Sequence, residues 1–553
     1  MAASVDIEKQ QGADLDVSSS NERGSVEANN TTNNNSNDNA ELKRDMKPRH
    51  VMMFSIACAI GTGLVIGSGT GLARGGPGSM LIAYMMIGAA VFFVMTALGE
   101  MAAFVPMNKG FGGYASRMVD PAFGYATGWN YFFKYIVATP TNLTAAGLVI
   151  RYWRPDLNVG IWIAVFGVCI IAINVLNVKY FGEFEFWMAS AKVIVMIVMI
   201  FSCFVIACGG GPNRDATGFR YWNDPGAFKA YLFEGDLGRF VGFWACLIQA
   251  VFAYTGTEVV GMTFGEVKNP RKNIPIAVKQ TFWRIFCFYI LGILFLGMTV
   301  PSNSDQLLGA LKKGTSGDAS PFVVAMNLAG VARFGDVING SLLIFTLSAA
   351  CTDIYCSSRS LYGLARDGQA PAIFGKTITS GAPIYAVGLS SMFVALGFMN
   401  VAQSAATVFT YLTSVLTIFA LLNWIAILIS HLRFRAAIKA QGITLADLPY
   451  VGFLQPYGTY YSLFISFLVV IFNGYDAFVP VFKVDTFITK YIGTLLFLLN
   501  IAFWKFYKKT KFWDPSEVDL VTGRRQAHEA EDVNDKQWNE GFWKKTVNKF
   551  KRK

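Results

Sequence analysis

The chain has 553 residues, of which 53% are hydrophobic and only 15% are charged. A soluble domain carries about 25% charged residues and its core stops growing beyond roughly 250–300 residues, so this composition excludes one large soluble domain. The formal net charge is +11, but much of it follows the last apolar stretch, where cations face anionic lipid. We therefore predict a polytopic membrane protein that contacts lipid and has no affinity for nucleic acid.

Both ends of the chain are polar. Residues 1–48 are rich in Ser, Asn, Asp and Glu and contain no apolar core, so we expect a disordered tail there and no cleavable signal peptide. Residues 509–553 form a second tail that is rich in lysine and arginine. Both tails are predicted to lie in the cytoplasm, because basic residues also occupy the alternate short loops between the apolar stretches.

Residues 49–508 are predicted to form the transporter domain. They contain apolar stretches of about 20 residues, the length that crosses a hydrocarbon core about 30 Å thick. The pattern predicts an all-α polytopic membrane protein with twelve transmembrane helices. We place these spans near 51–72, 80–105, 122–149, 159–178, 184–208, 240–264, 281–300, 333–363, 383–401, 404–430, 458–478 and 486–507.

The first and sixth spans are broken, at residues 60–64 (Ile-Gly-Thr-Gly-Leu) and at residues 253–258 (Ala-Tyr-Thr-Gly-Thr-Glu). Such breaks leave backbone groups without partners in lipid, so they persist where irregular backbone lines a cavity. The broken spans are five apart, which predicts an inverted 5+5 repeat with discontinuous helices 1 and 6. Repeat one covers about 51–208, repeat two about 240–430, and extra helices about 458–507.

The breaks offer complementary chemistry for a zwitterion. A helix that starts inside the membrane presents free N–H groups and positive dipole, so Gly61, Thr62 and Gly63 are our candidate carboxylate site. The second break offers carbonyl acceptors for an ammonium group. Close helix packing is the alternative explanation for the glycines. The candidates for the amino group and the gate are Phe252, Ala253, Tyr254, Thr255 and Glu258. Tyr254 is expected either to cap the substrate or to pack between helices.

The sequence contains little material for catalysis. None of the eight cysteines has zinc-ligand or redox spacing. The three histidines, His50, His431 and His528, are expected in flanking segments or tails, and no nucleophile motif is visible. We therefore expect no enzyme activity, no metal and no cofactor.

Short motifs along the chain resemble the signatures of fungal amino acid permeases of the amino acid–polyamine–organocation superfamily. The resemblance covers roughly residues 45–525 and implies the LeuT-type fold and proton-coupled amino acid uptake at the plasma membrane. It favours the zwitterion site over simple packing. A nutrient sensor of the same fold is an alternative, although such sensors resemble permeases with much longer tails or insertions. The motifs are Ile60-Gly61-Thr62-Gly63-Leu64, Leu98-Gly99-Glu100-Met101, Phe252-Ala253-Tyr254-Thr255-Gly256-Thr257-Glu258, Lys268-Asn269-Pro270-Arg271, Ser357-Ser358-Arg359, His431-Leu432-Arg433-Phe434-Arg435 and Gln455-Pro456-Tyr457-Gly458.

Two ionisable residues inside spans are candidates for proton coupling. Lys192 lies well inside the fifth span, and in related proton-coupled transporters a lysine at this place stands in for a bound sodium ion. We expect it to bridge the first and eighth spans when protonated, a purely structural lysine being the alternative. For Glu258 three roles stay open: it stabilises the unwound backbone, it accepts the coupled proton, or it pairs with a substrate cation. Glu100, near a cytoplasmic end, is expected in a solvated or gating salt bridge.

Specificity is expected to depend on the third span. Many fungal permeases for neutral and cationic amino acids carry a glutamate at the position of Asn142, so here no acid is expected to face the pocket from this place. Lys134 is a candidate partner for a substrate carboxylate, or it snorkels. Together with Ser320-Pro321-Phe322, these residues look closest to the dicarboxylic amino acid permease branch. We therefore expect uptake of aspartate and glutamate, with a broad or neutral amino acid permease as the alternative.

The N-terminal tail has a possible regulatory partner. Lys9, Lys43 and Lys47 resemble places where related permeases accept ubiquitin for endocytosis. We expect ubiquitin ligase machinery to act on this tail, and a merely solvated tail is the alternative.

Overall fold

The computed structural model describes residues 60–107, 110–175, 178–264, 270–313, 320–378, 381–401 and 404–522. All of them belong to one compact unit, Ala40–Lys553. The predicted disordered N-terminal tail, its three candidate ubiquitin sites and the start of the first predicted span lie outside the described residues. So do the end of the C-terminal tail and Lys268.

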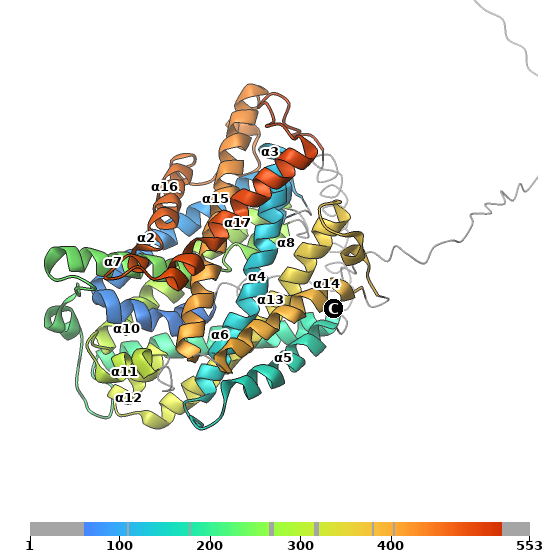
Figure 1. The fold of residues 1–553 in the computed structure, drawn as a ribbon. Helices are drawn as coiled ribbons and strands as arrows, with labels where there is room; N and C mark the ends of the chain where they lie inside the picture. The colour runs from blue at the N-terminus through green and yellow to red at the C-terminus, as the bar shows by residue number, and fades with distance from the viewer. Residues whose placement is uncertain are drawn as a thin grey trace, which may run out of the picture. The chain divides into compact units, whose positions relative to one another are not determined.

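Within these ranges the chain forms helices and no strand, as the apolar stretches predict (Figure 1). Backbone groups in lipid need partners within their own segment, and a helix provides them. The helices are η1 (Gly63–Gly67), α2 (Ser68–Phe104), α3 (Gly110–Met118), α4 (Pro121–Ile150), α5 (Val159–Val175), α6 (Val178–Ala207), η2 (Trp222–Gly226), α7 (Gly235–Tyr254), α8 (Val259–Thr263), α9 (Pro270–Arg284), η4 (Ile285–Ile290), α10 (Leu291–Thr299), α11 (Asp305–Lys313), α12 (Pro321–Leu328), α13 (Ala332–Arg366), η5 (Ala372–Gly375), α14 (Ile384–Met392), η6 (Phe393–Val401), α15 (Ala405–Ala440), η7 (Leu445–Asp447), α16 (Tyr457–Phe472), η8 (Tyr475–Ala477) and α17 (Val484–Lys508).

In the described part of the chain, nine helical segments are long and apolar enough to cross a membrane. One of them, Gly63–Phe104, contains parts of two predicted spans. Helix α5 is apolar but has only 17 residues. Helix α4 has 30 residues, among them Lys134 and Asn142, and is not among the nine. The protein is therefore an all-helical, multi-pass membrane protein.

The long helix α2 turns sharply at Gly76. The backbone of Gly76 has φ +82°, which a residue with a Cβ rarely adopts, and Pro77 follows. A Cβ at Gly76 would lie 2.8 Å from the carbonyl oxygen of Ala227. This turn separates the end of the first predicted span from the start of the second.

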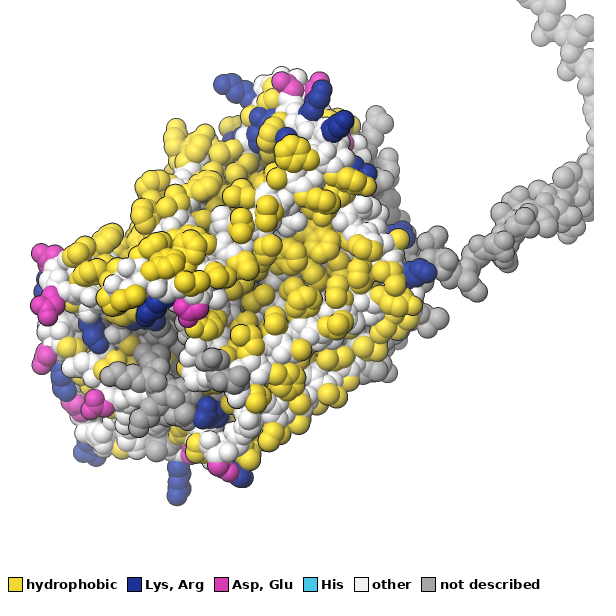
Figure 2. Space-filling view, viewed as in Figure 1, with side chains coloured by type: hydrophobic (Ala, Val, Ile, Leu, Met, Phe, Trp, Pro, Cys, Tyr) yellow, Lys and Arg dark blue, Asp and Glu magenta, His cyan; other side chains and the backbone are white. Residues whose placement is uncertain are grey.

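Large hydrophobic side chains face outward from several helices. Examples are Val168 on α5, Trp187 on α6, Phe464 on α16 and Leu498 on α17, all of which are more than half exposed. Figure 2 shows a face that is covered mainly by hydrophobic side chains, with charged side chains mostly toward its edges. A surface of this kind would aggregate in water and is suited to lipid.

Helix α4 is central to the packing of the helices. It packs against α13, α15, α3, α17 and α5, while α2 packs against α7. In Figure 1, α4 runs past α17 and α13, which come from distant parts of the sequence. This arrangement brings polar residues of α4 next to both broken segments and to α13.

Candidate functional site: a polar cavity between the broken helices

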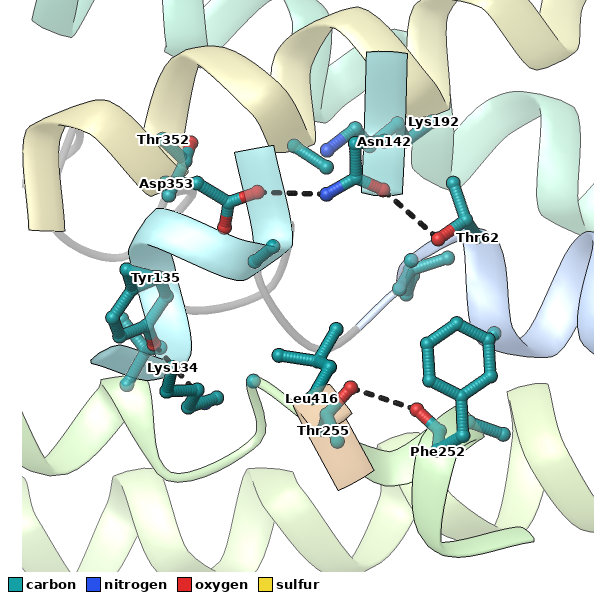
Figure 3. Close-up of a pocket in the computed structure, with 18 residues that line it drawn as sticks. Thr62, Lys134, Tyr135, Asn142, Lys192, Phe252, Thr255, Thr352, Asp353 and Leu416 are labelled. Carbon is teal, nitrogen blue, oxygen red and sulfur yellow. Dashed lines mark hydrogen bonds between the residues drawn. The ribbon is translucent and has the colours of Figure 1, made fainter. Parts of the chain in front are cut away.

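A cavity of about 60 Å³ lies where the two breaks, α4, α6 and α13 meet (Figure 3). At about 10–15 Å³ for each water, it has room for a few water molecules. Tyr254 and Glu258 are not among the residues that line it. The predicted site residues that do line it are Gly61, Thr62, Gly63, Lys134, Asn142, Lys192, Phe252, Ala253 and Thr255.

The first break serves both packing and the cavity. A Cβ at Gly63 would lie 2.7 Å from the carbonyl oxygen of Phe252 and 2.7 Å from Cα of Ala253, so this glycine lets the two breaks touch. At Gly61 an added Cβ would meet nothing within 4 Å. Thr62 is buried and precedes η1 without capping it through its side chain. Its hydroxyl is therefore free to donate to Asn142 Oδ1 at 2.9 Å.

The second break lies between the end of α7 and the start of α8. Gly256 has φ +95°, a left-handed conformation that ends α7. The carbonyl of Phe252 accepts from the Thr255 N–H at 3.2 Å and from the Thr255 hydroxyl at 2.7 Å. A carbonyl oxygen has two lone pairs, so in this conformation Thr255 occupies the acceptor that we assigned to a substrate ammonium group.

Tyr254 does not line the cavity, and of its two expected roles the contacts match packing and not a substrate cap. Its hydroxyl donates to the carbonyl of Tyr84 at 3.1 Å. Its ring stacks on that of Tyr289 with centroids 4.2 Å apart. The position next to the break suggested a gate, but the side chain is held in the packing between helices.

Lys134 and Glu258 form a buried ion pair, and their side chains are only 2% and 1% exposed. The ammonium also lies 3.3 Å from the hydroxyl of Tyr135. The second carboxylate oxygen of Glu258 accepts from the Gly256 N–H at 3.1 Å and from Trp424 Nε1 at 3.2 Å. Of the three roles left open for Glu258, these contacts match the stabilisation of unwound backbone. Lys134 does not snorkel, because its charge is paired inside the protein.

Asn142 joins the first break to an acidic residue that we did not anticipate. Its Nδ2 donates to Asp353 Oδ2 at 2.7 Å, while its Oδ1 accepts from Thr62 (Figure 3). Position 142 itself presents no acid, but α13 places the carboxylate of Asp353 beside it, so an anionic side chain would meet a like charge there after all. Asp353 and Thr352 line the cavity, as does Tyr135. Asp353 is a carboxylate within a predicted span, and the rule that marked Glu258 as a candidate applies equally to it.

Lys192 lines the cavity from α6 and is 1% exposed. Glu185, about two helical turns earlier on the same face of α6, is also buried and accepts from the Ser348 hydroxyl of α13 at 2.8 and 2.9 Å. Lys192 acts electrostatically on both Glu185 and Asp353. It thus faces α13, the eighth predicted span, while the part of the first span before residue 60 is outside the described residues.

A second buried ionic cluster lies away from the cavity. Glu100 and His431 are fully buried, and His431 Nε2 lies 2.7 Å from Glu100 Oε2. Arg435 donates to both oxygens of Glu100 at 2.8 and 2.5 Å, and the Gly452 N–H donates at 2.6 Å. The cluster ties α2 to α15 and to the segment before α16. Glu100 forms a buried salt bridge and not a solvated one, and His431 is a core residue and not a flanking one.

The beginning of the C-terminal tail is anchored at the start of α4. Asp120 caps α4 by accepting from the Ala122 N–H at 2.7 Å, and it accepts from Lys505 at 2.6 Å and Thr510 at 2.7 Å. Burial opposes ionisation of Asp120, but the three hydrogen bonds outweigh it and hold the pKa of the carboxyl below its usual value. The Trp513 indole then donates to a backbone carbonyl of α3 at 2.9 Å. The predicted C-terminal tail is therefore ordered over its first residues.

Comparison with known proteins identifies the family. The sequence model described as "Amino acid permease" matches residues 50–515. An uncharacterized amino-acid permease of Schizosaccharomyces pombe is 52% identical over 87% of this chain and 92% of its own length. A dicarboxylic amino acid permease of Saccharomyces cerevisiae is 46% identical over 88% of this chain and 80% of its own. A proline-specific permease of Emericella nidulans is 41% identical over 87% of this chain and 88% of its own. The chain therefore belongs to the fungal amino acid permease family, whose members are membrane transporters of amino acids and not enzymes.

Proposed function

We propose that this permease imports the acidic amino acids aspartate and glutamate together with protons across the plasma membrane. The observation that carries the substrate class is the cavity itself, because two lysines, Lys134 and Lys192, line the same small space as the first break. An acidic amino acid brings one negative charge more than a neutral one, and the ammonium groups of these two lysines attract that charge. The dicarboxylic permease among the relatives supports the same class.

The architecture that we propose is the LeuT-type fold with twelve transmembrane helices. Residues 49–508 form the transporter domain, with repeats at about 51–208 and 240–430 and extra helices at about 458–507. The touching breaks at Gly63 and Phe252 support this repeat, because equivalent broken helices meet at the substrate site in such folds. Both tails then lie in the cytoplasm, where ubiquitin ligase machinery reaches residues 1–48.

The α-carboxylate of the substrate is proposed to bind at the first break. Gly61 faces open space, so nothing prevents a carboxylate from reaching the backbone N–H groups there. The α-amino group then faces the second break near Ala253 and Thr255, with Asn142 beside it. Rotation of Thr255 away from the Phe252 carbonyl would free that acceptor.

Proton coupling is proposed to depend on Lys192. Its side chain is buried at the edge of the cavity and acts electrostatically on Glu185 and Asp353, so loss of its proton changes the charge that the substrate meets. Glu258 is the second candidate for the coupled proton. Its contacts with Lys134, Gly256 and Trp424 favour a role in holding the second break.

A neutral amino acid is the alternative substrate, and one feature of the site favours it. Glu258 neutralises Lys134, and Asp353 adds a negative charge to the cavity wall. The proline-specific relative shows that the family includes a permease named for a neutral amino acid. An amino acid sensor without net transport is the alternative of another class.

Uptake measurements distinguish these functions. Cells that lack their own amino acid permeases would express this chain and be supplied with labelled aspartate, glutamate, alanine or proline, with and without a proton uncoupler. We expect uptake of aspartate and glutamate that unlabelled alanine fails to inhibit and that the uncoupler abolishes. Selective alanine or proline uptake would replace the acidic class with the neutral one. Expression at the plasma membrane without uptake of any amino acid would favour the sensor.

A further inference from the structure

The geometry around Asp353 points to a proton site for the substrate side chain. We propose that Asp353 takes up one proton when an acidic amino acid binds and releases it with that amino acid in the cytoplasm. This inference rests on the proposed function and adds to it a specific residue, a position for the proton and a reason for selectivity.

The hydrogen bonds of Asp353 leave one of its oxygens for a proton. Asn142 donates to Oδ2 of Asp353 at 2.7 Å, and its own Oδ1 accepts from the Thr62 hydroxyl at 2.9 Å. The Asp353 carboxylate only accepts, so the NH2 group of the amide faces it, and the Thr62 hydroxyl supplies the matching donor on the other side. In Figure 3 the second oxygen of Asp353 points away from Asn142.

An amide NH2 can donate both to a carboxylate oxygen and, more weakly, to the carbonyl oxygen of a neutral carboxyl group. The bond from Asn142 therefore holds Asp353 in the same place in both protonation states. A proton on the other oxygen turns Asp353 into a donor at the wall of the cavity. The side-chain carboxylate of aspartate or glutamate is an acceptor without a proton of its own, so the two groups are complementary.

The charges that surround Asp353 make this proton necessary for an anionic substrate. Lys134 and Lys192 are positive, whereas Glu185, Glu258 and Asp353 are negative, so the ionised site has one negative charge in excess. An acidic amino acid adds a second negative charge in a small site whose polar side chains are largely buried. Like charges in such a site do not both stay ionised, and one of them takes a proton.

The remaining helices do not compensate this excess. Helices α5, α12, α14 and η5, which also pack against α13, carry no charged residue. Arg359, further along α13, is turned onto the ring of Tyr355 at 3.4 Å. The other titratable groups near Asp353 are the phenol of Tyr135 on α4 and the thiols of Cys351 and Cys356 on α13.

The proton and the charge balance in each cycle. The carboxylate of Asp353 binds one proton from the outside water as the substrate anion enters, so the pair adds no net charge to the site. In the inward-facing state the carboxyl returns this proton to the cytoplasmic water as the anion leaves. A neutral amino acid has no second carboxylate to accept a hydrogen bond from protonated Asp353, and the site therefore favours an acidic one.

The test replaces Asp353 with asparagine, which keeps a donor and cannot titrate. Wild type, Asp353→Asn and a matched control, Asp336→Asn, would be reconstituted in liposomes. Asp336 lies on the same helix α13 but is exposed and outside the cavity. The readouts are accumulation of labelled aspartate driven by a pH gradient, and exchange of internal for external aspartate without a gradient.

We expect wild type and Asp336→Asn to accumulate aspartate with the pH gradient. Asp353→Asn should still exchange aspartate, but its accumulation ratio should fall about tenfold for each unit of the pH gradient, because one proton fewer moves with each substrate. Accumulation by Asp353→Asn equal to that of wild type would overturn the inference and leave the proposed function intact. Wild type that takes up alanine but no aspartate would overturn both.

A second measurement covers the outcome that Asp353→Asn does not fold. Calorimetry of aspartate binding to the wild-type protein in buffers with different ionisation enthalpies counts the protons that are taken up on binding. Above the titration range of the site we expect about one proton for aspartate and none for alanine. An equal number for both amino acids would contradict the role of Asp353.

Discussion

The buried ion pair between Lys134 and Glu258 links the third predicted span to the second break, and its removal should be costly. The two residues are 124 positions apart, and their side chains are 2% and 1% exposed. Glu258→Gln leaves the Lys134 ammonium in the protein without its countercharge. Removal of one partner of a buried pair costs about 3–5 kcal/mol, because an uncompensated charge remains. We expect a loss of this size in the free energy of unfolding.

Lys134→Met should cost less than Glu258→Gln. The Glu258 carboxylate would still accept from the Gly256 N–H and from Trp424 Nε1. The double variant removes both charges, so it should recover most of the loss and give a coupling free energy of at least about 2 kcal/mol. Unfolding in mixed micelles with increasing SDS, followed by tryptophan fluorescence, measures these values.

The control for this experiment is Arg154→Met. Arg154 pairs with Asp156 on the surface, where the side chains are 58% and 59% exposed, so its loss should leave the unfolding midpoint nearly unchanged. Two single variants whose effects add in the double variant to within about 0.5 kcal/mol would refute the reasoning, because independent sites behave in that way. The pair would then contribute packing and not electrostatic stabilisation.

Three further predictions concern the breaks, the coupling lysine and the tail. Gly63→Ala should abolish uptake and lower stability, because its Cβ would lie 2.7 Å from the carbonyl oxygen of Phe252. In the control Gly388→Ala the added Cβ meets nothing within 4 Å, so uptake and stability should stay unchanged. Thermal denaturation measures stability, and labelled aspartate measures uptake. Lys192→Met should weaken proton-driven accumulation while keeping exchange, and undiminished proton-coupled uptake would contradict its role. The Asp120 carboxyl has a lowered pKa in the folded protein, so its contribution to stability is present above the unfolded pKa and is lost as the pH falls through the folded pKa. Hydrogen exchange of residues 509–518 in wild type should therefore become faster as the pH falls through the folded pKa of Asp120. Asp120→Asn should show fast exchange of these residues already at neutral pH. Equal protection of the two proteins at neutral pH would argue against the contact of the tail with Asp120.

The sequence alone determined the class of structure and the location of the breaks. An apolar stretch of membrane length forms a helix, because lipid offers no partner for backbone N–H and C=O groups and a helix pairs them within the segment. The same rule makes Gly61, Gly63 and Gly256 conspicuous, since they interrupt spans where interruption is costly. These signals are local, so they can be read residue by residue without knowledge of how the helices pack.

Only the tertiary structure decided which polar groups meet. Asp353 lies 211 positions from Asn142, and Glu258 lies 124 positions from Lys134. Whether a side chain on a long apolar helix faces lipid, a neighbour or a cavity depends on the rotation of that helix, which packing against other helices sets. Asp353 was therefore missed, Lys134 was expected to meet a substrate carboxylate or to snorkel, and the choice between capping and packing for Tyr254 stayed open. Charge pairing in a membrane protein is a property of the assembled bundle, because the partner that offsets each buried charge comes from another helix.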